Sequence, residues 1–348
     1  MNDRLKIGLA GYGYAGATFH APLIAHSGNT ELAAIATTQS DRARSDYPNA
    51  LIVADVDQLL AMDALDCIVI ATPNDSHFDL ACKVLRAGRH VVVDKPVTLC
   101  ARDARTLAEL AAENNVQCVP FHNRRWDGDF LTLQALIASG RLGRVTQFES
   151  HFDRFRPVVL QRWREQAAHG GGLLFDLGPH LIDQALVLFG MPVSISATIK
   201  QHRDQATAPD YMHLQLGYPD KEVLLHASTL CALVPARFIV HGTRGSYLKT
   251  GLDVQEDQLK SGMRPGVANF GNNPPGLLCE VLDCQSSNTD LPTQDGAYVE
   301  FYRALAQSIL HGAALPVTAQ QGIDVMLLID LAAQSAADGQ RKAVSQGT

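Results

Sequence analysis

The sequence predicts an α/β protein with two domains, a doubly wound parallel sheet at the N-terminal end and an α+β domain after it. Over the first 120 residues, short β-rich apolar runs alternate with longer helical stretches, a rhythm typical of βαβ units. From about His122, apolar and polar residues alternate along several runs, which is typical of an antiparallel sheet faced by helices. With 348 residues and 46% hydrophobic content, the chain is long enough to bury two cores. We place the domains at 1–121 and 122–348.

The first domain is expected to contain five strands and four helices. Apolar, β-branched runs predict strands at 5–10, 31–36, 65–71, 90–93 and 116–119. Apolar residues at helical spacing predict helices near 15–27, 57–62, 76–87 and 101–114. Gly88 directly follows the third helix, where a glycine readily ends a helix.

The second domain is expected to mix helices with alternating strands. Helical spacing predicts helices at 127–139, 179–189, 298–310 and 318–336. Alternation predicts strands at 194–201, 213–218 and 222–229. Segment 263–275 is rich in Gly, Pro and Asn and is predicted to be a long surface loop, and the polar tail after residue 336 is expected to fray.

Composition argues for a cytoplasmic protein that acts on a small molecule. A formal charge of -7 without basic clusters excludes nucleic acid or an anionic membrane as the main partner. Glycines between Gly8 and Gly16 interrupt the only apolar run that resembles a signal peptide, and no run reaches the length of a membrane span. The seven cysteines and 13 histidines show no spacing typical of a metal site, so we expect reduced cysteines and no metal.

The turn from residue 11 to residue 16 reads Gly11-Tyr12-Gly13-Tyr14-Ala15-Gly16 and joins the first predicted strand to the first predicted helix. Gly11 permits the tight turn, Gly13 lets the backbone approach a phosphate, and Gly16 lets helix and strand pack closely. The amide groups and dipole at the start of the helix would then hold a pyrophosphate. The sequence therefore predicts a dinucleotide site here, the alternative being a glycine-rich turn of an unrelated α/β protein.

The second predicted strand ends without the acidic residue that would bind an unmodified adenosine ribose. Instead it runs into Thr37 and Thr38, followed by Arg42 and Arg44. Hydroxyls and a guanidinium suit a ribose that carries a 2′-phosphate, which favours NADP over NAD. In the alternative interpretation, both threonines only form the turn, Asp41 caps the next helix and both arginines stay in solvent.

Two further strand ends carry polar residues where ligands bind in doubly wound folds. After the third predicted strand come Thr72, Pro73, Asn74 and His77, which are expected to line the cofactor, and Ser76 offers a structural alternative as a helix cap. The fourth predicted strand ends in Asp94-Lys95-Pro96. A lysine at the end of a buried strand is usually paired or used, although its side chain could instead extend along the domain surface into solvent.

The segment from Gly171 to His180 reads Gly-Gly-Leu-Leu-Phe-Asp-Leu-Gly-Pro-His. Pro179 suits the first position of a helix, so Asp176 is expected just before that helix and His180 in its first turn. Histidine has the side-chain pKa closest to neutral pH and therefore suits proton transfer. The structural alternatives are a helix cap for Asp176 and a hydrogen-bonded core histidine for His180.

These motifs together resemble the Gfo/Idh/MocA family of nicotinamide-dependent oxidoreductases over almost the whole length. The glycine turn, Lys95-Pro96 and the segment ending at His180 match the family pattern, whereas Asp94 stands where glutamate is usual. The stretches 122–127 and 162–165 resemble the branch that contains NADP-dependent scyllo-inositol dehydrogenase. The resemblance implies a Rossmann domain at 1–121 and, at 122–348, a domain for substrate binding and oligomerisation with a large, mostly antiparallel open sheet.

The resemblance also implies an activity, which is hydride transfer between the nicotinamide and a secondary hydroxyl or ketone of a sugar or inositol. Lys95, Asp176 and His180 are the implied catalytic residues, and Lys95 also borders the cofactor. The substrate wall is expected to include these residues, each of which could instead be simple packing: Asn123, Arg125, Trp126, Arg162, Trp163 and Tyr211.

The expected assembly is a homodimer or homotetramer formed through the sheet of the second domain. Two alternatives to the activity remain open. One is a catalytically silent sensor of dinucleotides with the same fold, and the other is a reductase of a non-sugar substrate.

Overall fold

The structure is a computed structural model that describes residues 4–234 and 236–345. The chain divides into two compact units, each assembled from three stretches of sequence. Unit 1 contains the chain up to Trp126 together with 255–270 and 297–326, and unit 2 contains 127–254, 271–296 and the chain from Leu327 onward. A single boundary at 121/122 follows the order of the sequence, whereas the units follow contacts, which bring late segments back to the N-terminal unit.

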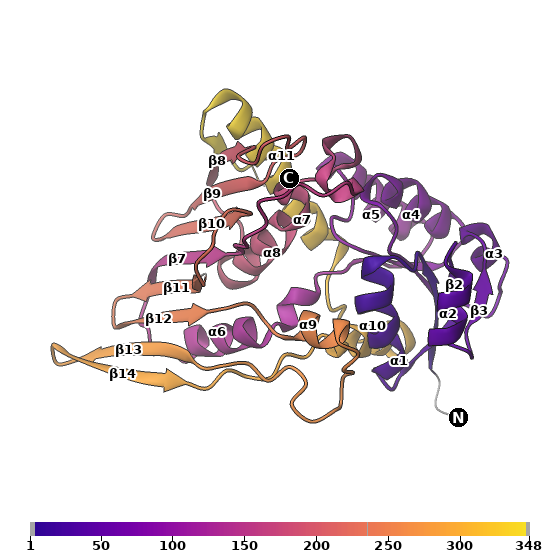
Figure 1. Cartoon of the computed structure of the whole chain (residues 1–348), viewed down its shortest axis with the longest axis horizontal. Helices are drawn as coiled ribbons and strands as arrows, with labels where there is room; N and C mark the ends of the chain where they lie inside the picture. The colour runs from indigo at the N-terminus through magenta and orange to yellow at the C-terminus, as the bar shows by residue number, and fades with distance from the viewer. Residues whose placement is uncertain (1–3, 235, 346–348) are drawn as a thin grey trace. The chain divides into compact units, whose positions relative to one another are not determined.

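Unit 1 is organised around a six-stranded sheet in which every neighbouring pair is parallel, in the order β3-β2-β1-β4-β5-β6 (Figure 1). From β1 the chain adds β2 and β3 on one side of the sheet and then β4, β5 and β6 on the other, so the strand order reverses at β1. In sheets of this kind, ligands bind at this switch point, beyond the carboxyl ends of the strands. The strands are β1 Leu5–Ala10, β2 Thr30–Ala36, β3 Leu51–Val53, β4 Cys67–Ile70, β5 His90–Val93 and β6 Cys118–Pro120. The prediction of a doubly wound parallel sheet is confirmed.

The helices of unit 1 follow amphipathic patterns. In α4, for example, Ala81, Val84 and Leu85 are buried, and Gly88 follows the helix with a φ of +69°, as predicted. The helical segments are η1 Gly16–His20, α1 Ala21–His26, α2 Ser40–Asp46, α3 Val56–Leu60, η2 Asn74–Ser76, α4 His77–Arg86, α5 Ala101–Glu113, η3 Asn123–Trp126, α9 Gln255–Lys260 and α10 Val299–His311. Helix α11, Ala319–Asp338, begins in unit 1 and continues into unit 2.

Late segments help to build the core of unit 1. Phe301, Tyr302 and Leu305 of α10 are fully buried in the same hydrophobic cluster as Leu5 and Ile7 of β1. The N-terminal sheet therefore depends on a helix almost 300 residues away in the sequence. Such long-range packing is invisible to local pattern reading, because each helix shows only its own apolar face.

Unit 2 contains a nine-stranded sheet in the order β14-β13-β12-β11-β7-β10-β9-β8-β15 (Figure 1). Only β7 and β10 pair in parallel, so the sheet is mostly antiparallel, as expected. The strands are β7 Val145–His151, β8 Ser194–Lys200, β9 Tyr211–Gly217, β10 Glu222–Ser228, β11 Ala236–Gly242, β12 Gly245–Thr250, β13 Gly276–Leu282, β14 Gln285–Leu291 and β15 Lys342–Ala343. Helices accompany one face of it: α6 Gly128–Ala138, α7 Leu173–Asp176 and α8 Gly178–Phe189, with short turns η4 Trp163–Glu165 and η5 Ala167–His169.

The two faces of this sheet differ. Along β9, Met212, Leu214 and Leu216 are fully buried on the face against which α7 and α8 pack. His213 and Gln215 alternate with them and are half-buried on the opposite face. Stretch 167–189 is long and apolar enough to cross a membrane, but 67% of its most apolar window is buried inside the protein, as in a core helix.

Several elements escaped sequence prediction. Strand β3 is apolar but has only three residues, too few to show a period. Strand β14 consists mainly of exposed polar residues and shows no hydrophobic pattern. The expectation that the tail frays is wrong for Lys342–Ala343, which pairs with β8. Most of segment 263–275 lacks regular structure, as predicted.

Candidate functional site

The glycine turn of unit 1 has the geometry that a dinucleotide requires. Gly11 adopts a φ of +98°, and a Cβ there would lie 2.5 Å from the carbonyl oxygen of Ala71. A Cβ on Gly16 would overlap the carbonyl oxygen of Gly11, so helix and strand pack as closely as predicted. At Gly13, by contrast, a Cβ would meet no atom within 4 Å, which leaves the backbone approachable by a phosphate. The turn leads into a π-helical segment, a distortion that is frequent at functional sites.

Gly13→Ala and Gly16→Ala should therefore behave differently. Alanine at position 13 fits the folded protein and should leave the melting temperature nearly unchanged while weakening dinucleotide binding, because its methyl group occupies the approach to the phosphates. Alanine at position 16 forces the turn apart and should lower the melting temperature. Thermal denaturation of both variants measures the change in melting temperature, and fluorescence titration with NADPH measures the change in affinity. Unchanged NADPH affinity in Gly13→Ala would contradict the proposed phosphate position.

Tyr12 and Tyr14 extend from the same turn in different ways. The Tyr12 ring is buried and its hydroxyl donates to Asp46 over 2.7 Å. Tyr14 is 44% exposed and donates to Glu256 over 2.6 Å, and partial burial and this carboxylate raise its pKa to about 12. Both hydroxyls are used within unit 1, so any contact of these residues with a cofactor would come from the backbone or from the rings.

The end of β2 presents polar groups to solvent. Arg42 is exposed, with Nη1 3.3 Å from Gln39 Oε1 and Nε 3.7 Å from Asp46. The Thr37 hydroxyl accepts from the amide of Gln39, so it does shape the turn, whereas Gln39 rather than Asp41 stands at the N-cap of α2. The capping alternative for Asp41 is thus wrong, and Thr38 and Arg42 lie where an exposed phosphate could be bound.

The loop after β4 is held by its own side chains. Ser76 stands at the N-cap of α4, as the capping alternative has it, but its side chain makes no cap bond. Its hydroxyl instead bonds to that of Thr72 over 2.6 Å and donates to the carbonyl of Pro73. His77 is buried, with its ring nitrogens 2.8 Å from the carbonyl oxygen of Pro96 and 2.9 Å from that of Thr72. His77 therefore ties this loop to the segment that carries Lys95.

Asp94, the residue before Lys95, is buried beside a histidine from the first helix. Its Oδ1 accepts from the amide of Lys95 over 2.8 Å and lies 3.8 Å from Nε2 of His20, an ion-pair rather than hydrogen-bond distance. Burial favours the protonated form of Asp94, but the contact with His20 and the charge of Lys95 outweigh it and hold its pKa at about 2. Nδ1 of His20 lies 2.6 Å from the hydroxyl of Tyr302. Asp94, which stands where the family usually has the longer glutamate, thus fixes the backbone at Lys95 through its side chain. The Lys95 side chain itself is half-buried.

In unit 2, the segment around Asp176 forms a helix break. Asp176 ends α7 and Pro179 lies in the first turn of α8, so His180 is in that turn as predicted and is 5% exposed. Gly172 has a φ of +99°, and a Cβ there would lie 2.8 Å from Pro209, which explains the glycine. Leu177, rather than Asp176, stands at the N-cap of α8, which corrects the cap alternative for Asp176.

Two of the predicted substrate residues in unit 1 are engaged by the protein itself. Arg125 donates from Nη1 to the carbonyl of Pro316 and to Gln321, both over 3.1 Å. Trp126 packs edge-on against Phe301, with ring centroids 5.9 Å apart. Asn123 is buried in η3 beside them. These contacts fit the packing alternative, and a role in substrate binding stays a prediction.

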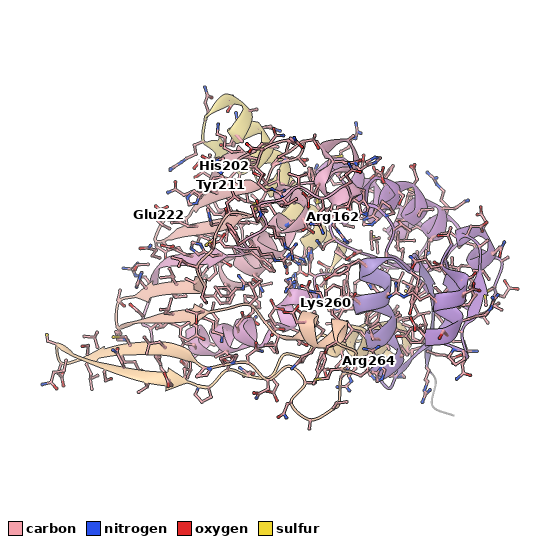
Figure 2. All side chains as sticks on the ribbon, in the orientation of Figure 1. Arg162, His202, Tyr211, Glu222, Lys260 and Arg264 are labelled. Carbon is pink, nitrogen blue, oxygen red and sulfur yellow. The ribbon has the colours of Figure 1, made fainter. Side chains whose placement is uncertain are left out.

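The predicted substrate residues of unit 2 lie in different places (Figure 2). Arg162 and Asp176 line one pocket, whereas Tyr211 lies on β9 with its ring 4.7 Å from that of His202 and 5.1 Å from that of His226. Trp163 stacks with the guanidinium of Arg164, 4.8 Å from its ring centroid. Arg162 lines the pocket, whereas Trp163 and Tyr211 do not line it but are each next in sequence to a residue that does.

Sequence analysis missed residues that support these groups from a distance. Arg237 is fully buried and donates to Gln184 of α8 over 2.6 Å, which holds the helix that carries His180. Glu165 pairs with both Arg162 and Arg203 around the pocket. The contacts of Arg237 with Gln184 and of Arg203 with Glu165 show no local sequence signal, because the partners lie far apart in the sequence.

Among the described residues, one group has the composition and spacing of a metal site. His151, Asp153 and His226 have ligand atoms within 4.8 Å of one another, and His151 pairs with His226 across β7 and β10. Asp153 lies 3.4 Å from Nδ1 of His151 and 3.5 Å from Nε2 of His226. These contacts explain why the three side chains are close together without a metal ion. The expected absence of a metal stays a prediction.

The residues of unit 1 fit a bound dinucleotide. The open approach at Gly13, the left-handed Gly11 and the polar end of β2 all lie along the carboxyl edge of β1, β2 and β4. A bound nicotinamide would supply the capacity to accept or donate hydride. The chain itself contributes a cation at Lys95 and, in unit 2, a carboxylate at Asp176 and an imidazole at His180.

Comparison with known proteins matches both halves of the chain. Residues 5–122 match the NAD-binding Rossmann fold of an oxidoreductase family, and residues 134–344 match the C-terminal alpha/beta domain of the same family. YdgJ of Escherichia coli, described as an uncharacterized oxidoreductase, is 47% identical over 97% of both chains. IolW of Bacillus subtilis, a scyllo-inositol 2-dehydrogenase (NADP(+)), is 36% identical over 96% of this chain and 94% of its own.

Solved structures give the same picture. The Bacillus subtilis protein yvaA, described as an oxidoreductase, superposes with a TM-score of 0.96 at 35% identity and covers 99% of each chain. A Yersinia pestis protein, YPO2259, also described as an oxidoreductase, gives a TM-score of 0.96 at 44% identity over 100% of this chain and 99% of its own.

Proposed function

The chain belongs to the Gfo/Idh/MocA family of oxidoreductases, and from that premise we propose that it is an NADP-preferring dehydrogenase of sugars or inositols. It interconverts a secondary hydroxyl with the corresponding ketone. The observation that carries the proposal is the dinucleotide cradle of unit 1, whose second strand ends in hydroxyls and Arg42 where NAD-binding folds have an acid. The NADP-dependent scyllo-inositol dehydrogenase among its relatives supports both the proposed cofactor and the proposed class of substrate.

In the proposed chemistry, each residue acts on the substrate oxygen or on its neighbour. His180 Nε2 or Nδ1 takes the hydroxyl proton during oxidation and returns it during reduction. The Lys95 ammonium polarises that oxygen and stabilises the negative charge that develops on it. Asp176 orients Lys95 or His180. Asp94, which His20 and the charge of Lys95 hold ionised, fixes the backbone at Lys95.

A screen of inositols, pentoses and hexoses with NADP and with NAD tests the proposal. Oxidation of at least one polyol, with a lower KM for NADP than for NAD, is expected. Tight NADPH binding without turnover of any compound would favour the silent sensor. Turnover confined to non-sugar ketones would favour the reductase alternative.

We also propose that copies of the chain associate through the sheet of unit 2. One face of β9 and β10 carries half-buried polar residues and is not the face against which α7 and α8 pack. Antiparallel sheets can leave one face open, and we propose that a second copy of the chain covers this one. All seven cysteines are free thiols, which fits the cytoplasm.

Light scattering at micromolar concentration should therefore give the mass of a homodimer or homotetramer. A charged substitution at the centre of the open face, His213→Glu, should shift the mass towards the monomer, because it adds a like charge to both surfaces of an isologous contact. Gln134→Glu on α6 is a control outside that face. A monomer mass for the unaltered protein would contradict this assembly.

A further inference from the structure

The pocket of unit 2 that is lined by Asp176 has an excess of positive charge. Its wall contains five arginines but only three carboxylates. Four of the arginines come from the segment that follows β7 and one from the turn after β8: Arg154, Arg156, Arg162, Arg164 and Arg203. Five guanidinium groups around one small space repel one another unless anions balance them.

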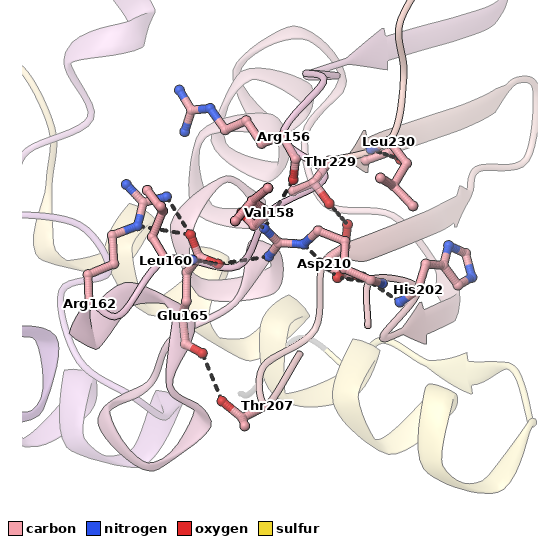
Figure 3. Close-up of polar contacts among 12 residues, drawn as sticks. Arg156, Val158, Leu160, Arg162, Glu165, His202, Thr207, Asp210, Thr229 and Leu230 are labelled. Atoms are coloured by element: carbon pink, nitrogen blue, oxygen red, sulfur yellow. Dashed lines mark hydrogen bonds and ion pairs between the residues drawn. The ribbon is translucent and has the colours of Figure 1, made fainter. Parts of the chain in front are cut away.

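The carboxylates of the wall balance only part of this charge. Arg203 is pinned between Glu165, 3.0 Å from Nη2, and Asp210, 2.9 Å from Nε (Figure 3). Arg162 uses the other oxygen of Glu165 at 2.8 Å. Glu165 and Asp210 are thus both committed to these two arginines, and Asp176 is the remaining carboxylate of the wall.

Arg156 lies outside this network of carboxylates. Its backbone carbonyl accepts from Arg203 and its amide donates to Thr229, so the main chain at this position is fixed. Its side chain is exposed, and no contact reaches its guanidinium among the described residues (Figure 3). A fixed backbone with an available planar fork is the arrangement that binds carboxylate or phosphate through two parallel hydrogen bonds.

The rest of the wall suits the carbon skeleton of a polyol. Phe152, Leu173 and Pro209 contribute apolar surface next to the arginines. The guanidinium of Arg154 lies over the ring of Phe152, 4.8 Å from its centroid, which restricts the orientation of that arginine. The wall of the pocket therefore combines apolar side chains, cations and the predicted catalytic carboxylate Asp176.

We propose that this pocket binds an anionic group of the substrate, so that the preferred substrates are sugar acids or sugar phosphates rather than neutral polyols. Arg156 is the primary ligand of the carboxylate or phosphate. The inference rests on the proposed function, because it places the anion on the molecule whose hydroxyl is oxidised. It is a specificity determinant and leaves the chemistry at the hydroxyl unchanged.

Matched ligands test the proposal. D-Glucose, D-gluconate and D-glucose 6-phosphate are titrated calorimetrically into the protein saturated with NADP, and the same compounds are assayed for turnover. One charge-assisted fork should make at least one anionic compound bind roughly ten- to a hundredfold more tightly than glucose, and added salt should reduce the difference. The two anions distinguish a carboxylate from a phosphate preference.

Variants at position 156 complete the test. Arg156→Ala should bring the anionic compounds to the affinity of glucose, and Arg156→Lys, which keeps the charge but loses the fork, should lie between. Arg105→Ala, at an exposed position of α5, is the control and should change nothing. Because the Arg156 side chain makes no contact among the described residues, its removal should leave the melting temperature unchanged.

The outcomes separate this inference from the proposed function. Equal affinity for neutral and anionic compounds, or an anionic preference that survives Arg156→Ala, overturns the inference even if neutral polyols are oxidised. Tighter binding of anionic compounds that is lost in Arg156→Ala supports the inference. If the protein shows this binding but oxidises no compound with either cofactor, the inference stands and the proposed dehydrogenase function is wrong.

Discussion

Replacing His180 by alanine should lower the turnover number by about 10² to 10⁴-fold, the usual contribution of general acid-base catalysis. Lys95→Ala should lower it by a similar factor, because removal of one positioned electrostatic donor typically costs about 10² to 10³-fold. Both variants should keep nearly the same affinity for NADPH, since we propose that these side chains act on the substrate oxygen. Steady-state kinetics together with cofactor titration measure the two effects separately.

Two further variants refine this prediction. The double variant should be far less impaired than the product of the single effects, because residues that act as a unit lose their joint contribution once. Asp176→Asn should cost less than either single alanine variant if Asp176 only orients its neighbours. If His180→Ala retained more than about a tenth of the unaltered turnover, His180 would not be the proton-transfer residue.

Replacing Arg42 by alanine should remove most of the preference for NADPH over NADH, a change of roughly ten- to a hundredfold in relative affinity, as expected for one charged fork contact. Arg42 is exposed, and its described contacts are a 3.3 Å bond to Gln39, a 3.7 Å ion pair with Asp46 and a position over the Tyr12 ring, 5.4 Å from its centroid. Contacts of exposed side chains such as these contribute little to stability, so its loss should leave the fold intact. Fluorescence titration with both cofactors measures the ratio.

Arg44 provides the matched control for this experiment. It lies in the same helix and is also exposed, with an ion pair of 3.9 Å to Asp41. Arg44→Ala should reduce the preference less than Arg42→Ala. Equal affinities of the unaltered protein for NADPH and NADH would show that the end of β2 does not recognise a 2′-phosphate.

Local sequence patterns were sufficient to predict two kinds of element, namely helices with one buried face and strands that are buried along their whole length. Strands β1 and β5 follow directly from their apolar, β-branched sequences, and α4 from its amphipathic spacing and Gly88. The glycine turn was predictable because the three glycines have separate steric reasons that the structure reproduces at Gly11 and Gly16. Strand β14 was not, because it is polar and its register comes from pairing with β13.

The supports of the candidate site were beyond the reach of pattern reading. His20 approaches Asp94 across 74 residues of sequence, and Glu165 joins arginines from two loops. Such contacts depend on tertiary packing, which no local propensity encodes. The identity of Asp94 could be read from the sequence, but its ionised, buried state could only be explained once His20 was placed beside it.

Transfer of deuterium from NADPH to a ketone substrate is the most direct test of whether the protein catalyses hydride transfer. The protein is incubated with a ketose or inosose that the screen identifies and with NADPH that carries deuterium at C4 of the nicotinamide, and the product is examined by NMR and mass spectrometry. The account predicts one deuterium on the carbon that bears the new secondary hydroxyl, and a strongly reduced rate of labelling with His180→Ala. An alcohol product without deuterium at that carbon, or NADPH that binds tightly while no ketone in the panel is labelled, would contradict it.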